Sequence, residues 1–184
     1  MSVTGEWIQT YTGRRVDPFN LQPQDVVIED IAHALSLIAR FGGHCARFYS
    51  VAQHSLIVSV CAPNEYQLWG LLHDAAEAYL GDIPRPIKRR LPGFLDVEDK
   101  VLRAIATRFG LYWPMPDIIK QLDTSALRFE AGALMGNTRG WKDLAEETPT
   151  IDAKTARPLL YLRSPEAEQR VLDRFLLLTT QTPT

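Results

Sequence analysis

The sequence predicts an all-α domain with a short extended arm or hairpin at its N-terminus. From residue 27 onward, apolar residues recur at the spacing of three and four residues that is typical of helices. Residues 7–16, WIQTYTGRRV, alternate loosely around a Thr12-Gly13 turn signal instead. A length of 184 residues suits a single domain with a real hydrophobic core. We therefore expect one domain with three parts: an arm at 1–26, a helical core at 27–135, and a C-terminal loop and helix at 136–184.

The first two helices are predicted from their apolar residues. Residues 17–26 contain two prolines and are expected to form a loop. The first helix follows and is expected to end at Gly42-Gly43, which would place Arg40 and Phe41 at its end. Residues 50–61 form a second helix, which is almost wholly apolar. The stripe of the first helix consists of Ile28, Ile31, Ala32, Leu35 and Ile38.

The third helix is predicted to start after Pro63 and to run to Gly81. Asn64 and Gln67 have the spacing of a capping box at its start. Its apolar stripe consists of Leu68, Leu71, Leu72, Ala75, Ala76 and Tyr79.

The remaining elements are predicted from proline, charge and apolar spacing. A basic, irregular connector, PRPIKRRLPG, comes before a helix at about 95–109. Another helix spans about 117–135, with Asp117 as its expected N-cap. Residues 137–163 are expected as mixed loop, and a last helix starts at Ser164-Pro165.

Composition limits the function classes. The net charge of −2 provides no strong field for binding a nucleic-acid polymer or an anionic membrane. No apolar run is long enough to span a membrane, and no signal peptide is visible. Cys45 and Cys61 form neither a disulfide framework nor a metal-type pair. We therefore expect a cytoplasmic protein.

All four histidines lie between residues 33 and 73, which is mildly unusual clustering. Each has an ordinary structural interpretation. His33 could pair with Glu29 on an exposed helix face. His44 could be a solvated loop residue, and His54 could be a hydrogen-bonded histidine of the core.

The polar face of the third helix is more informative. His73, Asp74 and Glu77 lie within an arc of about 100°, opposite the apolar stripe. This face could simply be exposed to solvent, but it contains no Lys or Arg. The small residue Gly70 on the same face indicates that another element packs closely there. The hypothesis of a buried polar site therefore stands beside that of a solvated face.

A histidine from the preceding helix and an aspartate from a later one could complete a metal site with His73 and Asp74. His54 lies nineteen residues before His73, and Asp123 lies on the flank of the stripe of the 117–135 helix. Two nitrogens and two oxygens with open positions suit Mn, Co, Fe or Ni. Zn is possible, and Mg binds imidazole ligands less readily.

These residues resemble a known family. His54, the run LLHDAAEAYLGDIPRPIK, and Asp123 in QLDTSALRFEA resemble the HD-domain metal-dependent phosphohydrolases, over about residues 30–135. The resemblance is closest to the 5′-deoxynucleotidase-like branch and to small phage deoxynucleoside triphosphohydrolases. It implies that His54, His73, Asp74 and Asp123 hold a metal. It also implies that Glu77 orients and deprotonates the attacking water, with Asp82 nearby.

Several basic and aromatic residues are candidates for substrate binding. Lys88 and Arg85 could meet the phosphate or could form a solvated basic loop. Where the deoxynucleotidase branch has an Arg-Trp pair, this chain has Arg40-Phe41, one residue closer to the first metal histidine. Phe41 could still exclude a ribose hydroxyl. His44 and Arg47 could meet base or phosphate.

We therefore expect a hydrolase that releases phosphate from deoxynucleoside monophosphates. A triphosphohydrolase acting on deoxynucleoside triphosphates is the nearest alternative, and hydrolysis of cyclic nucleotides or alarmones is a further one. Two other classes remain: a non-catalytic nucleotide-binding regulatory module and a helical interaction protein. A homo-oligomer is expected, with Trp113, Trp141 and Tyr161 as candidate interface residues.

Overall fold

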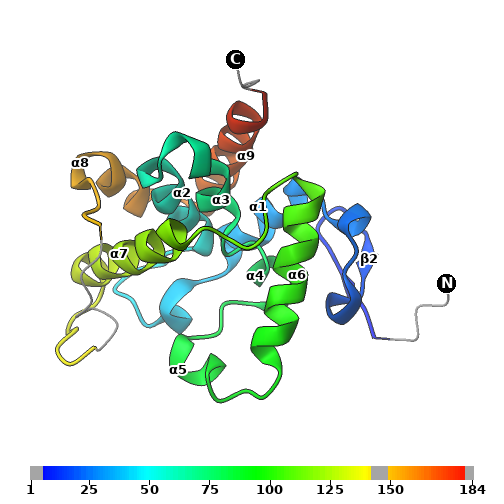
Figure 1. Cartoon of the computed structure of the whole chain (residues 1–184). Coiled ribbons are helices and arrows are strands. Elements are labelled where there is room, and N and C mark those ends of the chain that lie inside the picture. The colour runs from blue at the N-terminus through cyan, green and yellow to red at the C-terminus, as the bar shows by residue number, and fades with distance from the viewer. Residues whose placement is uncertain (1–5, 142–148, 181–184) are drawn as a thin grey trace.

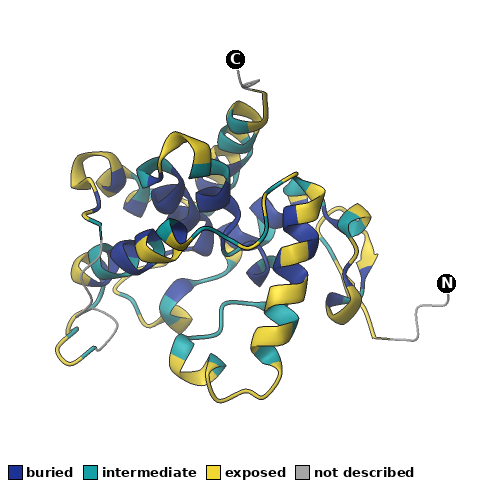
Figure 2. Cartoon of the chain, viewed as in Figure 1, coloured by how far each residue is buried: buried dark blue, intermediate teal, exposed yellow. Residues whose placement is uncertain are grey.

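The protein is an all-α bundle with a short N-terminal β-hairpin, as the sequence predicts. The computed structural model describes residues 6–141 and 149–180. Figure 2 shows that the buried segments gather in the middle of the bundle and that exposed segments lie at its periphery. Within the described residues, no helix is both long and apolar enough to cross a membrane. The central helix is α2 (Val51–Cys61), which contacts α1 (Ile28–Leu37), α3 (Gln67–Leu72), α7 (Asp117–Leu134) and α9 (Ser164–Thr180) (Figure 1).

The predicted hairpin is present and is tied to α1. Strand β1 (Ile8–Gln9) pairs antiparallel with β2 (Arg15–Val16). The Asp30 carboxylate accepts hydrogen bonds from Thr12 N (2.7 Å) and from Thr12 Oγ1 (3.0 Å). Asp30 is 2% exposed, so both of its oxygens are used to hold the hairpin turn against α1.

The next segment is more ordered than predicted. Residues 17–26, expected as loop, contain two short 3₁₀ helices, η1 (Pro18–Asn20) and η2 (Pro23–Asp25). Each begins with a proline, whose fixed φ suits a first helical turn.

Helix α1 ends earlier than predicted. Its last residue is Leu37, because Ala39 forms a β-bridge with Ser50 and the chain turns away from the helix axis. The following 3₁₀ turn, η3 (Arg40–Gly43), places Phe41 at a φ of 57°, in the left-handed region. Arg40 and Phe41 therefore belong to a separate turn and do not end the first helix.

The predicted third helix is interrupted where its polar residues lie. A 3₁₀ turn, η4 (Asn64–Tyr66), precedes α3, and the four residues 73–76 separate α3 from α4 (Glu77–Leu80). Backbone bonds from Ala75 N to Leu72 O and from Glu77 N to Asp74 O, both 3.0 Å, span three residues instead of four. The predicted Asn64 capping box is absent. The Gln67 amide donates instead to the Asn64 side chain at 3.1 Å.

The remaining elements follow the prediction with three local differences. The connector contains one helical turn, α5 (Arg85–Lys88), before α6 (Phe94–Arg108). Asp117 is the first residue of α7 and does not cap it, because its carboxylate accepts from Lys120. Part of the mixed loop lies outside the described residues, and the rest contains α8 (Ala153–Ala156) and η6 (Arg157–Tyr161).

Candidate metal centre

The site forms where α2 and α3 approach each other closely. Gly70 makes this approach possible, because a Cβ atom on it would lie 2.8 Å from Ser59 Cα. Three residues after Gly70, His73 ends α3 and points toward α2. His54 lies on α2 and is 0% exposed. The small residue on the polar face of the third helix therefore marks a close contact between helices, as its position predicted.

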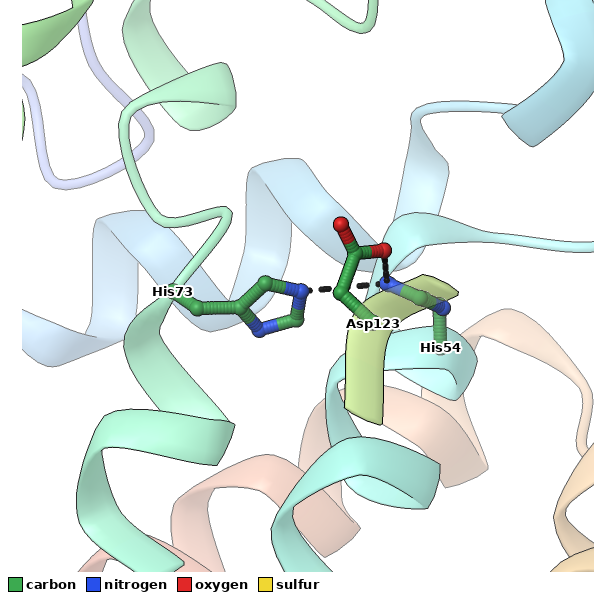
Figure 3. A group of neighbouring side chains, drawn as sticks. All are labelled: His54, His73 and Asp123. Carbon is green, nitrogen blue, oxygen red and sulfur yellow. Dashed lines mark hydrogen bonds and ion pairs between the residues drawn. The ribbon is translucent and has the colours of Figure 1, made fainter. Parts of the chain in front are cut away.

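Four side chains from three segments converge on one point (Figure 3 shows three of them). His54 Nε2 lies 3.1 Å from His73 Nε2, 3.2 Å from Asp123 Oδ1 and 3.4 Å from Asp74 Oδ2. His73 Nε2 lies 3.4 Å from Asp74 Oδ2. Two atoms bound to one ion at about 2.1 Å lie about 3.0–3.4 Å apart in octahedral or tetrahedral geometry. The spacing is that of a ligand set, and His54, His73 and Asp123 form a group that can hold a metal ion.

Hydrogen bonds to the far side of each imidazole leave the converging nitrogens as acceptors. The Gly70 carbonyl lies 2.8 Å from His73 Nδ1, and the Glu130 carboxylate lies 2.6 Å from His54 Nδ1. Because a carbonyl and a carboxylate only accept, each Nδ1 donates. In the neutral rings, both Nε2 atoms then carry lone pairs that face the two aspartates. Two imidazole nitrogens and two carboxylates that face one another are ligands that divalent cations bind, so the residues fit a bound metal ion.

The local pKa values also indicate a site that holds positive charge. Burial and Arg40 lower the pKa of His54, but Glu130 and Asp123 outweigh them and raise it to about 9. Burial raises the pKa of Asp74, but His73, His54 and Arg40 bring it well below its usual range. Without a metal ion, His54 is therefore protonated at neutral pH, and an incoming cation displaces this proton.

Glu77 is a buried carboxyl group beside this centre. It is 4% exposed, and its Oε2 has no hydrogen-bond partner among the residues that the structure describes. Burial, together with the charges of Asp74 and Asp82, raises its pKa well above the usual range, against the opposing effect of Lys88. Burial also raises the pKa of Asp82, which Asp74 increases further and Arg40 opposes. The surroundings of the centre thus raise the pKa of two neighbouring carboxyl groups.

The two predicted phosphate-binding cations of α5 lie at the same place. Lys88 Nζ lies 2.5 Å from Glu98 Oε1 of α6 and 3.5 Å from Glu77 Oε1. Arg85 Nη2 donates to Asp123 Oδ2. Both cations contact carboxylates of the site, so the hypothesis of a simply solvated basic loop does not describe them.

Arg40 lies inside the protein. It is 8% exposed, and its Nη1 lies 3.3 Å from Asp74 Oδ2. Its Nε lies 3.3 Å from Glu130 Oε2, as an ion pair without hydrogen-bond geometry. Its guanidinium group therefore contacts carboxylates of the centre, whereas the sequence analysis placed it on the substrate.

The other predicted substrate residues lie on the η3 turn and the loop after it. Phe41 is half-buried, and its ring centroid lies 6.3 Å from that of Trp141. His44 and Arg47 are exposed, and the Arg47 guanidinium stacks over the Tyr161 ring at 4.0 Å. The Arg47 side chain thus contacts η6, whereas the Arg40 side chain contacts Asp74.

The structure also places His33 and the aromatic residues considered for an interface. His33 contacts Glu168 of α9 at 3.1 Å, so its predicted pairing with Glu29 is wrong. Of the aromatic residues considered for an interface, Tyr161 is 60% exposed, whereas Trp113 lies against Trp69. The homo-oligomer stays a prediction.

Sequence reasoning missed Glu130, which is 0% exposed. It lies on α7 seven residues after Asp123, which is two helical turns and therefore the same face. This spacing was the available signal. It could not be interpreted without knowing that α7 packs against α2.

Comparisons with known proteins place the chain among relatives. It is 37% identical over 153 residues to YfdR of Escherichia coli strain K12, named an uncharacterized protein, covering 83% of this chain and 86% of YfdR. It is also 37% identical over 144 residues to RCAP_rcc00048 of Rhodobacter capsulatus, likewise named uncharacterized, covering 71% of this chain and 74% of that protein. No family model matches the chain.

Proposed function

We propose that this chain, which belongs to the same family as YfdR and its Rhodobacter capsulatus relative, is a metal-dependent phosphohydrolase of the HD superfamily. The proposed reaction is hydrolysis of a deoxynucleoside 5′-monophosphate to nucleoside and phosphate. The proposed cofactor is Mn, Co, Fe or Ni, because two imidazole nitrogens and two carboxylate oxygens suit these ions.

The observation that carries the proposal is the convergence of His54, His73, Asp74 and Asp123 next to a buried carboxyl group with a free oxygen. The four atoms lie 3.1–3.4 Å apart in the pairs that contact each other. Glu77 follows Asp74 by one tight turn and leaves its Oε2 unpartnered. Two imidazole nitrogens that face two carboxylates, beside a buried carboxyl group with an oxygen free to accept a proton, are the groups that a metal-dependent hydrolase needs.

A divalent cation bound by these four residues would polarise a phosphoryl group and lower the pKa of a nearby water molecule. The Glu77 carboxylate would accept the proton of the attacking water, and its raised pKa suits a base that works near neutral pH. Asp82, a second carboxyl group with a raised pKa, would exchange a proton with the leaving nucleoside oxygen in this proposal.

The cations of α5 would meet the phosphate. Lys88 lies between Glu77 and Glu98, within reach of the same reaction centre. Arg85 contacts Asp123 at the open side of the group and is about one-third exposed. Positive groups at this place would offset the charge of the substrate phosphate.

Product analysis tests the proposal. Protein with Mn or Co is incubated with dAMP and with dATP, and Asp74→Ala, which removes an anionic ligand, serves as the blank. Release of phosphate and nucleoside from dAMP supports the proposal. Release of triphosphate from dATP would make the protein a triphosphohydrolase with the same centre. Nucleotide binding without turnover would indicate a regulatory module instead.

A further inference from the structure

A buried carboxylate, Glu130, contacts His54 on the side of the ring that faces away from the converging atoms. Glu130 is 0% exposed, and its two oxygens have different partners. Oε1 lies 2.6 Å from His54 Nδ1, and Oε2 lies 3.3 Å from Arg40 Nε. Arg40 in turn lies 3.3 Å from Asp74 Oδ2 through Nη1. Glu130 is thus linked to one candidate ligand directly and to a second through Arg40.

Glu130 is not itself placed to bind the ion. The two nitrogens of an imidazole point away from each other, and the four converging atoms lie on the Nε2 side of His54. Glu130 contacts the Nδ1 side. Full burial of a carboxylate is unfavourable unless charged partners compensate for the lost hydration, and here they are an imidazole and a guanidinium.

Helix α7 holds the His54 ring at both ends. Asp123 Oδ1 lies 3.2 Å from Nε2, and Glu130 Oε1 lies 2.6 Å from Nδ1. Seven residues advance a helix by about 10.5 Å, which is enough to place one carboxylate at each end of an imidazole ring. The same helix therefore supplies a ligand beside His54 and a partner for its opposite nitrogen.

We infer that Glu130 is a positioning residue of the metal centre: it accepts the Nδ1 proton of His54, which leaves Nε2 free to bind metal, and it holds Arg40 where Arg40 contacts Asp74. This inference rests on the metal binding of the proposed function. Carboxylates that accept from the non-ligating nitrogen fix the ring orientation and make the ligating nitrogen more basic. Removing them commonly weakens metal binding about 10–100-fold.

The test compares two substitutions of the same kind. Glu130→Gln keeps the shape of the side chain but removes its charge and one acceptor oxygen. Glu168→Gln makes the same change in the other histidine–carboxylate pair, His33–Glu168, which is partly exposed. The Kd for Mn is measured on full-length protein by calorimetry, and circular dichroism and Tm monitor the fold. We expect Glu130→Gln to weaken Mn binding about 10–100-fold, and Glu168→Gln to leave it unchanged.

Each outcome has one meaning. Equal Mn binding by Glu130→Gln and the wild type would overturn the role of Glu130 and leave the metal centre intact. Equal weakening by Glu168→Gln would also overturn it, since any histidine-linked carboxylate would then have the effect. A wild type that binds no Mn, Co or Zn would overturn this inference together with the proposed metal site.

A second measurement avoids dependence on the variant folding. In the zinc-loaded wild type with ¹⁵N-labelled histidine, His54 should show a directly bonded proton on Nδ1 and a metal-shifted Nε2. A His54 ring that lacks the Nδ1 proton would overturn the assignment, whatever the stability of Glu130→Gln.

Discussion

Two histidine–carboxylate pairs in this molecule have the same chemistry and different surroundings. His54 and Glu130 are both 0% exposed and lie 2.6 Å apart. The side chains of His33 and Glu168 are 29% and 23% exposed and lie 3.1 Å apart. The second nitrogen of His54 faces another imidazole and two aspartates, whereas the His33 ring is stacked at 3.7 Å on Tyr11 of the hairpin.

The difference shows what turns such a pair into a candidate site. A partly exposed pair joins two helices, α1 and α9, and contributes at most about 1 kcal/mol. A buried pair is unfavourable unless its partners compensate for the lost hydration. The His54–Glu130 pair lies in the core, and the second nitrogen of His54 faces His73, Asp74 and Asp123. Burial and the surroundings of the second nitrogen, more than the pair itself, therefore distinguish the site from the scaffold.

The largest contrast is expected between His54→Gln and His33→Gln. His54 Nε2 contacts three of the other converging atoms, so His54→Gln should lose stoichiometric metal and all measurable turnover. His33→Gln should keep both and lose at most about 1 kcal/mol of stability. Metal content of protein purified without chelator, together with turnover on dAMP, measures the contrast. Loss of metal in His33→Gln would show that the two pairs are not functionally different.

A second contrast concerns two buried carboxylates. Glu77 keeps one oxygen unpartnered, whereas both oxygens of Asp30 accept bonds from Thr12. Glu77→Gln should keep the metal and lower kcat about 10²–10⁴-fold, the usual contribution of a general acid or base. Loss of metal as complete as in His54→Gln would make Glu77 a ligand.

The stability of metal-free Glu77→Gln provides a further test of that contrast. Because the folded-state pKa of Glu77 is raised, the wild type loses stability as pH rises from the ordinary value of about 4 through the raised one. The glutamine variant cannot ionise, so its Tm advantage should grow over that range and vanish at lower pH. Asp30→Asn should behave oppositely. It should keep full activity and lose about 1–3 kcal/mol of stability, because asparagine has one acceptor oxygen and leaves one of the two Thr12 donors without an acceptor.

A smaller effect is expected at Phe41, which lies next to the buried Arg40. If Phe41 packs on C2′ of the sugar, a ribose hydroxyl there would lack a partner, at a cost of about 1–3 kcal/mol. Phe41→Ala should then reduce the deoxy-to-ribo ratio of kcat/KM for dAMP and AMP by roughly ten- to a hundredfold. Tyr11→Ala, which changes an aromatic ring at the hairpin, should leave the ratio unchanged. An unchanged ratio with a lowered Tm in Phe41→Ala would make Phe41 a core residue only.

The comparison of sequence and structure also shows which features of the fold were predictable from sequence and which were not. The hairpin and the main helices were predictable, because turn residues and apolar spacing act locally. The interruption at residues 73–76 was not, since His73 and Ala76 keep ordinary helical dihedrals and only the hydrogen-bond spacing changes. The end of α1 was missed because a bridge between Ala39 and Ser50 decides it, and that contact is not local.

The candidate ligands could be singled out because His73 and Asp74 share a helix face with no basic residue. The groups that support them could not. Arg40 was expected to contact the substrate, and nothing in the sequence analysis singled out Glu130. Only the packing of η3 and α7 around α2 turns both side chains inward, toward Asp74 and His54. The adjacent pair His73-Asp74 leaves a pattern within one segment, whereas Arg40 and Glu130 reach the site only through contacts between segments far apart in the chain.

The smallest expected effect compares two helical glycines, one at the site and one away from it. A Cβ on Gly70 would lie 2.8 Å from Ser59 Cα and 3.0 Å from Val58 O, both backbone atoms of the neighbouring helix. Gly70→Ala should therefore force α2 and α3 apart, at a cost of about 1–3 kcal/mol. It should also weaken Mn binding, because the Gly70 carbonyl orients His73. Around Gly132 of α7, no described atom outside its own stretch of helix lies within 4 Å of an added Cβ. Gly132→Ala should therefore be neutral or should stabilise by up to about 1 kcal/mol, with unchanged Mn binding. At this chain length each kcal/mol shifts Tm by about 2–4 °C, so thermal unfolding of the two metal-free variants resolves the difference. A Gly70→Ala protein as stable as Gly132→Ala would mean that the helices can separate without loss, and that the close approach does not hold His54 and His73 together.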